Sequence, residues 1–456
     1  MALQLYDTLQ RSKVAFELRE PGKVSMYVCG PTVYDAPHVG HGRTAVFYDV
    51  IRRYLEWTGL EVEFVGNVTD VDDRIIARAA ESGSTEPEVA QRFEAAYWEQ
   101  LDRLDVRRPD AAPHATQYIE QMLKLIEELV ESGHAYVIPE SGVYFDVTTF
   151  PSYGGLPHRT IEQLLDSAGA RVEVDEAKRN PIDFALWKAA KPGEPMWDSP
   201  WGPGRPGWHI ECSAMSLDLL GESFDLHGGG DDLVFPHHEN ERVQAEAAGH
   251  PFARHWVHSA MVMVGGEKMA KSVGNFTTLE DALDAHGGRA FRVAILQTHY
   301  RKAVELGDAE LEAAASTIAG LDALARRAAS AGIDPAGAPL DETVVQGFRD
   351  AMDDDFGTPN AVGEIFKAVT SANSAIDAGD TAGAASLLAT VVDLAGALGL
   401  TLAAGTGEDE AIDAMVAARD RARAEKDFAA ADRLRDELAI LGVTLEDTPT
   451  GTIWHR

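Results

Sequence analysis

Residues 24–65, VSMYVCGPTVYDAPHVGHGRTAVFYDVIRRYLEWTGLEVEFV, carry the pattern that decides the fold. Residues 24–28 are β-prone and precede a Gly30-Pro31 turn, and residues 43–58 carry apolar side chains at helical spacing. A second β-prone segment, 61–65, follows directly. A strand, a helix and a strand joined by short links predict a parallel strand pair, and therefore an α/β, Rossmann-like nucleotide-binding core.

The remaining chain divides by composition. At roughly 100–200 residues per domain, 456 residues suggest about three domains. A stretch rich in Pro, Gly and Trp is expected to be irregular and to separate two halves of one sheet, and an Ala-rich stretch with helical spacing predicts a helical bundle. The expected segments are a first Rossmann-like half at 1–133, an insertion at 134–207, a second half at 208–264, a loop-bearing region at 265–307, an α-helical bundle at 308–400 and a small C-terminal module at 401–456.

The charge is strongly negative. Forty basic and 74 acidic residues give a net charge of −34, so the chain repels polyanions at long range and nucleic acid is not its default partner. Such a surface suits a cytosol of very high ionic strength, where the Debye length falls to about 3 Å, and we hold that habitat as a hypothesis. No apolar run reaches the ~18 residues of a membrane helix, and the N-terminus lacks the pattern of a secretory signal, so a soluble cytoplasmic protein is expected.

The first motif with chemical content is His38-Val39-Gly40-His41, where the first strand passes into the helix. Glycine allows the backbone to approach a ligand closely, and a helix N-terminus favours an anion. Two imidazoles three residues apart can donate hydrogen bonds to phosphate oxygens. Taken alone, the motif is better explained by two loop histidines with local hydrogen bonds, but the strand–turn–helix context and the second motif below favour a phosphate site.

The second motif is the glycine-led stretch 265–272, GGEKMAKS, which contains Lys268 and Lys271, two of only 11 lysines. A loop with two ammonium groups can close over a triphosphate and neutralise charge in the transition state. A solvated loop with incidental charge is the alternative for such a pair in isolation.

A metal site is the third candidate. The chain has two cysteines, Cys29 and Cys212, and His237 and Glu241 fall four residues apart on one face of a predicted helix that begins at Pro236. Two thiolates, one imidazole and one carboxylate form a tetrahedral zinc set. The spacing leaves the ligand choice open, because His238 or Glu239 could substitute, and buried core thiols beside capping histidines would explain the same residues.

With these motifs the chain resembles the class I aminoacyl-tRNA synthetases, and specifically the cysteinyl-tRNA synthetases. His38–His41 matches the family's HIGH motif, and residues 268–272 match KMSKS except that Ala270 replaces a serine. The resemblance covers nearly the whole chain and includes further blocks at 29–35, 66–70, 204–215, 235–241 and 419–454.

The resemblance implies an ATP-dependent activation of L-cysteine and its transfer to tRNA(Cys), with Mg²⁺ accompanying ATP and no editing domain. It implies that a zinc ion held by Cys29, Cys212, His237 and Glu241 contacts the substrate thiolate. It assigns catalytic roles to His38, His41, Lys268 and Lys271, ATP contacts to Thr32, His38, Gly40, His41 and Lys271, and the cysteine or adenylate pocket to Thr69, Trp208, His227 and Asp232. Because Ala270 leaves both lysines in place, altered loop kinetics rather than lost activity are expected.

The tail resembles the family's anticodon-binding segment. Arg419, Arg423 and Lys426 fall at i, i+4 and i+7 and predict one basic stripe, with Arg433 nearby and Trp454 as a stacking platform. Interleaved acidic residues make an exposed, salt-bridged helix the alternative for this segment. A monomer is expected.

Two other functions compete with this one. A related ligase could use the same cysteinyl-adenylate to acylate an amino sugar, as in mycothiol synthesis, but such an acceptor gives no reason for a C-terminal module. A catalytically inactive, zinc-bearing RNA-binding scaffold is the other, and the retained histidines and lysines of both nucleotide motifs argue against it.

Overall fold

The structure is a computed structural model that describes residues 2–168, 177–268, 277–403, 410–448 and 451–455. The chain separates into two compact units. The first contains residues 1–314, 349–360 and 397–399, and the second contains residues 315–348, 361–396 and 400–456.

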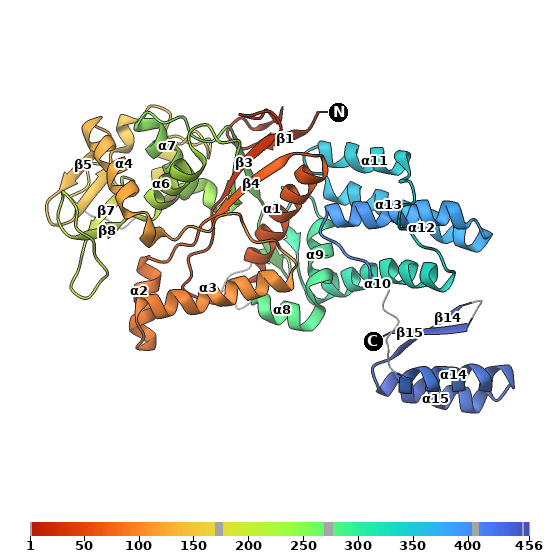
Figure 1. The fold of residues 1–456 in the computed structure, drawn as a ribbon. Coiled ribbons are helices and arrows are strands. Elements are labelled where there is room, and N and C mark those ends of the chain that lie inside the picture. The colour runs from red at the N-terminus through yellow and green to blue at the C-terminus, as the bar shows by residue number, and fades with distance from the viewer. Residues whose placement is uncertain (1, 169–176, 269–276, 404–409, 449–450, 456) are drawn as a thin grey trace. The chain divides into compact units, whose positions relative to one another are not determined.

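A four-stranded parallel sheet forms the centre of the first unit (Figure 1). Its strand order is β10-β9-β3-β4, so strands from both halves of the expected domain pair directly, with β3 between β4 and β9. This confirms the predicted Rossmann-like α/β core. The strands are β3 (Lys23–Val28), β4 (Glu61–Gly66), β9 (Leu226–Gly230) and β10 (His255–Ser259).

Helix α1 (Val39–Trp57) connects β3 to β4 and begins four residues earlier than the apolar spacing predicts. The reason is an unusual N-cap. The ring Nδ1 of His38 accepts a hydrogen bond from the backbone N–H of Gly40, which satisfies one of the free donors at the helix start. Histidine is not among the residues preferred at this position, so propensity alone did not place the start here.

Further helices cover this core, and among them α6 and α7 carry metal-site candidates. Residues of the sheet, α4, α6 and α7 share one apolar cluster, which includes both cysteines. Around the core lie α2 (Asp73–Ser82), α3 (Glu86–Arg103), α4 (Ile119–Glu131), α6 (Trp208–Leu220), α7 (Glu239–Ala247), α8 (Leu279–His286) and α9 (Gly288–Leu296). Short strands complete the unit: β1 (Gln4–Asp7), β2 (Ser12–Ala15), β11 (Val262–Val264), β12 (Glu267–Lys268) and β13 (Val304–Glu305).

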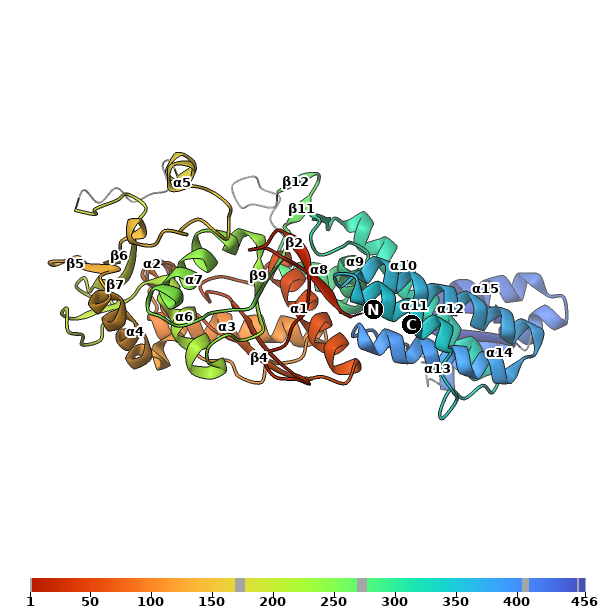
Figure 2. The ribbon, with the colours of Figure 1, turned by 90° about the horizontal axis from the view of Figure 1, so that it is seen from above.

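The insertion is more regular than its composition predicts. It holds an antiparallel sheet in the order β5-β6-β7-β8, which lies beside α4 and α6 in both views (Figures 1 and 2). The short strands, separated by Gly- and Pro-rich connections, obscured the alternating pattern. The elements are β5 (Ala135–Ile138), β6 (Gly142–Phe145), α5 (Ile161–Ala168), β7 (Phe184–Ala189) and β8 (Gly204–Pro206).

The segment 349–360 groups with the first unit although the sequence places it inside the bundle. The buried carboxylate of Asp355 explains this. It accepts hydrogen bonds from the backbone N–H of Tyr6 (2.7 Å) and the hydroxyl of Tyr300 (2.6 Å), and it pairs with Arg301 (2.7 Å).

Helices dominate the second unit, as the Ala-rich composition predicts. It takes most of α10 (Asp308–Ser330), α11 (Glu342–Asp353), α12 (Thr358–Ala378) and α13 (Thr381–Ala397). Its C-terminal module consists of α14 (Glu410–Ala424), α15 (Phe428–Ile440), β14 (Thr444–Thr448) and β15 (Gly451–His455). Within the described ranges, no helix combines the length and apolarity needed to cross a membrane.

Candidate active site

A cavity of about 460 Å³ opens at the carboxyl ends of the parallel strands. Its lining includes Cys29 after β3, Asn67 after β4, Asp231 after β9 and Ala260 after β10. Ligands of open parallel α/β sheets bind in this position, because the loops that leave the strands converge there. The cavity is therefore the candidate active site.

Four of the five residues predicted to bind ATP meet at this cavity. Thr32, His38, Gly40 and His41 all line it. The His38 and His41 rings are stacked, with centroids 3.8 Å apart. These four residues are spread over ten positions of the sequence, and the structure brings them to one cavity.

The hydrogen bonds at the helix start select one tautomer for both rings. Nδ1 of His38 accepts from the N–H of Gly40 at 3.1 Å, and Nδ1 of His41 accepts from the N–H of His38 at 3.1 Å. A neutral imidazole that accepts at Nδ1 carries its proton on Nε2. Burial, followed by the charges of His38 and Arg74, holds the pKa of His41 well below 6.5. His41 is therefore neutral near pH 7, and its Nε2–H is a donor.

The candidate metal ligands lie together in the buried core. Sγ of Cys29 is 3.4 Å from Oε1 of Glu241, and Nε2 of His237 is 3.0 Å from the same oxygen. Ligand atoms of Cys29, Cys212, His237 and Glu241 all lie within 4.8 Å of one another. Burial raises the pKa of both thiols and of the Glu241 carboxyl. A buried group of this kind needs a cation to keep its thiolates and carboxylate charged.

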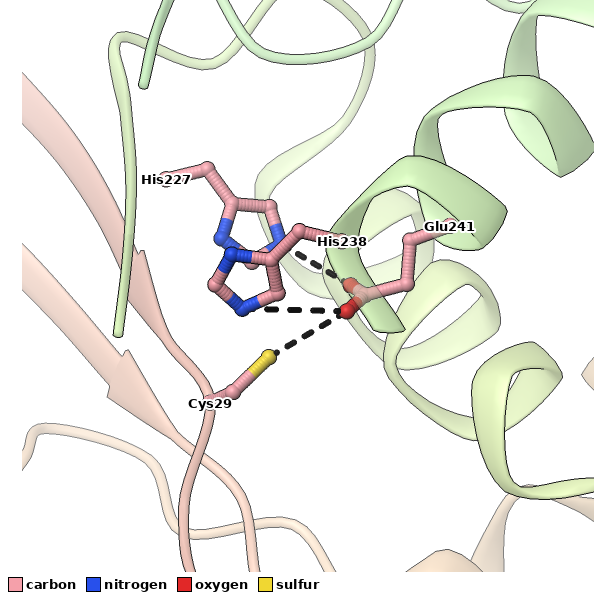
Figure 3. A group of neighbouring side chains, drawn as sticks. All are labelled: Cys29, His227, His238 and Glu241. Carbon is pink, nitrogen blue, oxygen red and sulfur yellow. Dashed lines mark hydrogen bonds and ion pairs between the residues drawn. The ribbon is translucent and has the colours of Figure 1, made fainter. Parts of the chain in front are cut away.

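A second set of four residues shares two of these ligands (Figure 3). It combines Cys29 and Glu241 with His227, whose Nε2 is 2.8 Å from Oε2 of Glu241, and with His238, whose Nε2 is 3.9 Å from Oε1. Because both sets use Cys29 and Glu241, only one metal ion fits at a time. The two sulfurs of the first set make it the more favourable one for zinc.

The structure also narrows the ligand choice that the spacing left open. Glu239 is committed elsewhere: it accepts from the backbone N–H groups of Gly154 (2.7 Å) and Leu156 (2.8 Å) and pairs with Arg242 (2.9 Å). Helix α7 begins at Glu239 rather than at Pro236, after a wide turn, yet the predicted neighbours four residues apart still meet.

His209 orients the predicted imidazole ligand and was missed by sequence reasoning. Its Nδ1 lies 2.9 Å from Nδ1 of His237, on the side of that ring away from Glu241. Burial lowers the pKa of His209 to about 3, so its neutral ring can accept the Nδ1–H of His237. Such a contact fixes the tautomer that leaves Nε2 of His237 available to a metal ion. No spacing rule connects positions 209 and 237, so sequence offered no signal.

Two of the four predicted cysteine-pocket residues line the cavity and two do not. Trp208 and Asp232 line it, and the Trp208 ring stacks on that of His237 with centroids 4.2 Å apart. Thr69 and His227 are buried outside the cavity lining. The hydroxyl of Thr69 donates to Glu211 (3.0 Å) and accepts from the side-chain amide of Asn67 (3.2 Å). The side-chain oxygen Oδ1 of Asn67 in turn accepts from the backbone N–H of Gly30 (2.8 Å), which joins the two loops.

The described residues include only the first part of the loop that carries the second motif. The backbone of Lys268 belongs to β12, which pairs with β11. Lys271 and Ala270, with their predicted roles, lie outside the described residues.

The predicted tRNA-binding residues of the C-terminal module differ in their exposure to solvent. Arg423, Lys426 and Arg433 are exposed. Arg419 is instead 8% exposed. Its guanidinium binds Asp447 at 2.9 Å, and Arg423 pairs with the same carboxylate at 2.6 Å. This differs from the predicted uniform basic stripe.

The structure corrects the interpretation of Trp454 as an exposed platform. Its ring is 4% exposed and packs with Ile412, Val416, Leu438 and Val443, while its indole N–H donates to Asp413 at 2.7 Å. The side chain is a core residue of the module because β15 covers α14. Phe428, which is 64% exposed at the start of α15, presents an aromatic face instead.

Comparison with known proteins defines the class. Residues 15–316 match the model of the tRNA synthetases class I (C) catalytic domain, and residues 347–403 match that of the DALR domain. A methionyl-tRNA synthetase from Mycobacterium tuberculosis, solved in complex with methionyl-adenylate, has the same fold with a TM-score of 0.60 at 16% identity, covering 82% of this chain and 89% of that one. A putative arginyl-tRNA synthetase from Campylobacter jejuni has a TM-score of 0.56 at 13% identity, over 85% and 94% of the two chains. The chain is a class I aminoacyl-tRNA synthetase.

Closer relatives give the family. Residues 406–454 match the model of the cysteinyl-tRNA ligase anticodon binding domain. The proteins named "Cysteine--tRNA ligase" from Halorhodospira halophila and Symbiobacterium thermophilum are 49% and 46% identical to this chain, over 100% of its length and 99% and 100% of theirs. The chain belongs to the cysteinyl-tRNA synthetase family.

Proposed function

We propose that the protein activates L-cysteine with ATP, with Mg²⁺, and transfers it to tRNA(Cys). The observation that carries this proposal is the shared position of Cys29. It lines the cavity with the paired histidines, and it also belongs to the buried group of sulfur, nitrogen and oxygen ligands. The same cavity therefore has candidate phosphate-binding histidines on its surface and, at Cys29, adjoins a candidate metal site that could bind a thiolate.

In the activation step the carboxylate of cysteine attacks the α-phosphate of ATP and pyrophosphate leaves. Positioning and charge stabilisation dominate such a reaction. His38 and His41 donate their Nε2–H groups to phosphate oxygens, since their Nδ1 atoms are already engaged by the backbone. Both rings are fixed by the helix start before substrate arrives, so little reorganisation accompanies the reaction. Lys271 neutralises the migrating charge and Lys268 supports the closed loop.

The ligand set Cys29, Cys212, His237 and Glu241 fits a zinc ion. Its donors are those of mixed tetrahedral zinc sites, and His209 holds His237 in the tautomer that a metal ligand requires. Zinc bound there would supply a soft Lewis acid that binds the thiolate of cysteine and discriminates against the hydroxyl of serine. Selection against serine by such a specific interaction reaches about 10⁴-fold, beyond the roughly 1–3 kcal/mol of an apolar pocket, which makes editing unnecessary.

The test is Cys212→Ser, compared with Ser216→Ala on the same helix. Ser216 is buried and its hydroxyl donates to the carbonyl of Ser213 at 3.2 Å, so the control perturbs α6 without touching a ligand. We expect the first variant to lose stoichiometric zinc and cysteine-dependent ATP–pyrophosphate exchange together, and the control to keep both. Full exchange activity in metal-free Cys212→Ser protein would contradict the zinc role.

For transfer to tRNA, we infer that the C-terminal module uses Arg423, Lys426 and Arg433 for phosphates and Phe428 for a base. These side chains are exposed, and aromatic stacking on unpaired bases is worth about 1–3 kcal/mol per base. Phe428→Ala should raise the KM for tRNA about 5- to 100-fold and leave ATP–pyrophosphate exchange unchanged. Ile440→Ala is the matched control, because Ile440 is an exposed apolar residue at the other end of α15. Equal tRNA affinity of both variants would remove Phe428 from the interface.

The acylation of an amino sugar is not favoured. Residues 406–454 match an anticodon-binding model, and a small acceptor has no use for one. Aminoacylation assays with tRNA and with an amino sugar acceptor, run on the same preparation, separate the two reactions.

A further inference from the structure

Tyr27 shares a face of strand β3 with the first metal-ligand candidate. It precedes Cys29 by two residues, and side chains two apart on a strand project to the same side. That side is covered by α6, which carries Cys212, and it meets His227 of β9, whose ring lies edge-on to that of Tyr27 with centroids 5.3 Å apart. The Tyr27 side chain is fully buried.

The hydroxyl of Tyr27 has no ordinary partner. Among the described residues, no atom, sulfur included, forms a hydrogen bond with it. It belongs to the same buried cluster as Cys29 and Cys212. Burial, followed by the neighbouring Cys212, Cys29 and Glu241, raises the pKa of the Tyr27 hydroxyl well above 10, so the hydroxyl keeps its proton and lies near these ligands. An unsatisfied buried hydroxyl costs about 1–3 kcal/mol, whereas phenylalanine would fill the same space without that cost. The polar atom therefore needs an explanation other than packing.

The negative charge of the ligand set explains why a hydroxyl is useful at this position. Two thiolates and one carboxylate carry one more negative charge than a zinc ion neutralises, and a substrate thiolate would add a second. A buried excess of negative charge is stabilised by hydrogen bonds from neighbouring donors to the ligands. His227 already provides one such contact to Glu241, at 2.8 Å. The sulfur ligands need an equivalent donor.

We propose that the Tyr27 hydroxyl donates a hydrogen bond to the Cys212 thiolate and thereby positions it and withdraws charge from it in the metal-bound protein. This inference rests on the zinc site proposed above. Tyr27 is a positioning residue, because it touches a ligand and not the substrate. Its effect is to lower the electron donation of Cys212, which leaves the metal ion a stronger acceptor for a substrate thiolate.

The experiment compares Tyr27→Phe with Tyr54→Phe in the full-length protein. Tyr54 is an equally buried tyrosine, but its hydroxyl donates to Asp353 at 2.6 Å, remote from the ligand set. Two properties are measured: the zinc affinity, by competition with a chromophoric chelator, and the sulfur-to-cobalt charge-transfer band of the Co²⁺-substituted protein. We expect Tyr27→Phe to weaken zinc binding about 10- to 100-fold and to move the band to lower energy, because the thiolate becomes more electron-rich. Tyr54→Phe should resemble the wild type in both.

A second substitution guards against a folding defect. Incorporation of 3,5-difluorotyrosine at position 27 strengthens the phenol as a donor and should move the cobalt band to higher energy. If Tyr27→Phe and the fluorinated protein both keep the wild-type affinity and band, the hydroxyl is not a donor to the metal-bound thiolate and the inference falls, while the zinc site stands. If the wild-type protein itself binds neither zinc nor cobalt, the zinc site falls and the inference with it.

Discussion

Replacement of Arg43 by methionine tests how much stability comes from the hydrogen bonds between the helix of the first nucleotide motif and the segments next to β11 and β13, which precede and follow the lysine-bearing loop. Arg43 follows the second histidine of the motif and is 2% exposed. Its guanidinium donates to the backbone carbonyls of Met261, Tyr300 (3.1 Å) and Lys302. Met261 immediately precedes β11, and Tyr300 and Lys302 precede β13, which pairs with β11. Burial lowers the pKa of Arg43 to about 10, so the group is charged near pH 7.

The magnitude follows from the three carbonyls that Arg43→Met leaves without their donor. A buried acceptor that loses its partner costs about 1–3 kcal/mol. Only the bond to Tyr300 is fully buried, and water can reach the other two in part, so they add roughly 0.5–1 kcal/mol each. Methionine keeps most of the apolar contact of the stem. The expected loss in the free energy of unfolding is therefore about 2–5 kcal/mol.

Urea denaturation followed by circular dichroism measures this loss, and ATP–pyrophosphate exchange measures its functional consequence. Because Met261 also lines the cavity, the KM for ATP should rise in Arg43→Met. Arg43→Lys should recover part of the stability, since one ammonium can reach some of the carbonyls. Arg92→Met, at an exposed position of α3, should stay within about 0.5 kcal/mol of the wild type. An Arg43→Met protein as stable as the Arg92→Met control would refute the reasoning.

The remaining predictions concern pH, salt and backbone packing. Hydrogen bonds to Glu222 and Glu128, both 2.9 Å, raise the pKa of His250 above 6.5, so its stabilising effect is complete below about pH 6.5 and is lost as the pH rises through the folded-state pKa. His250→Ala should therefore lower the thermal midpoint more at pH 6 than at pH 9, and an equal shift at both would speak against it. With a net charge of −34, the melting temperature should rise between 0.1 and 2 M KCl as the Debye length falls from about 10 Å to below 3 Å, and a flat or falling profile would exclude self-repulsion as a limit on stability. In Gly30→Ala the new Cβ would lie 1.6 Å from the carbonyl oxygen of Asn67, so exchange activity should drop at least tenfold with a lowered melting temperature, and an unchanged enzyme would show that the two loops move apart at no cost.

Several features followed from sequence because they rest on local order. The strand–helix–strand pattern of residues 24–65 predicted the parallel pair β3 and β4, whose register now runs from Lys23 opposite Glu61 to Val28 opposite Gly66. His237 and Glu241 meet because four residues make about one helical turn. The paired histidines at the strand–helix junction likewise lie on the cavity that their position predicted.

Other features could not be read from the chain. His209 beside His237, and Tyr27 in the same buried cluster as Cys212, come from elements that are separated in sequence, and no periodicity relates them. The burial of Trp454 and the exposure of Phe428 have the same origin. Composition marks both as aromatic, but only the packing of β15 on α14 decides which ring is covered.

By itself, the order of residues determined the class of fold, the position of the nucleotide motifs and the chemical types of the candidate metal ligands. Backbone propensities and short spacings act over one or two turns or strands, so they can be read along the chain. The tertiary structure alone decided which of these side chains are committed to other partners, which tautomer each histidine adopts and which donors surround the ligands. Those outcomes depend on burial and on contacts between distant segments, and both exist only after the sheet has brought residues such as Cys29 and Cys212 together.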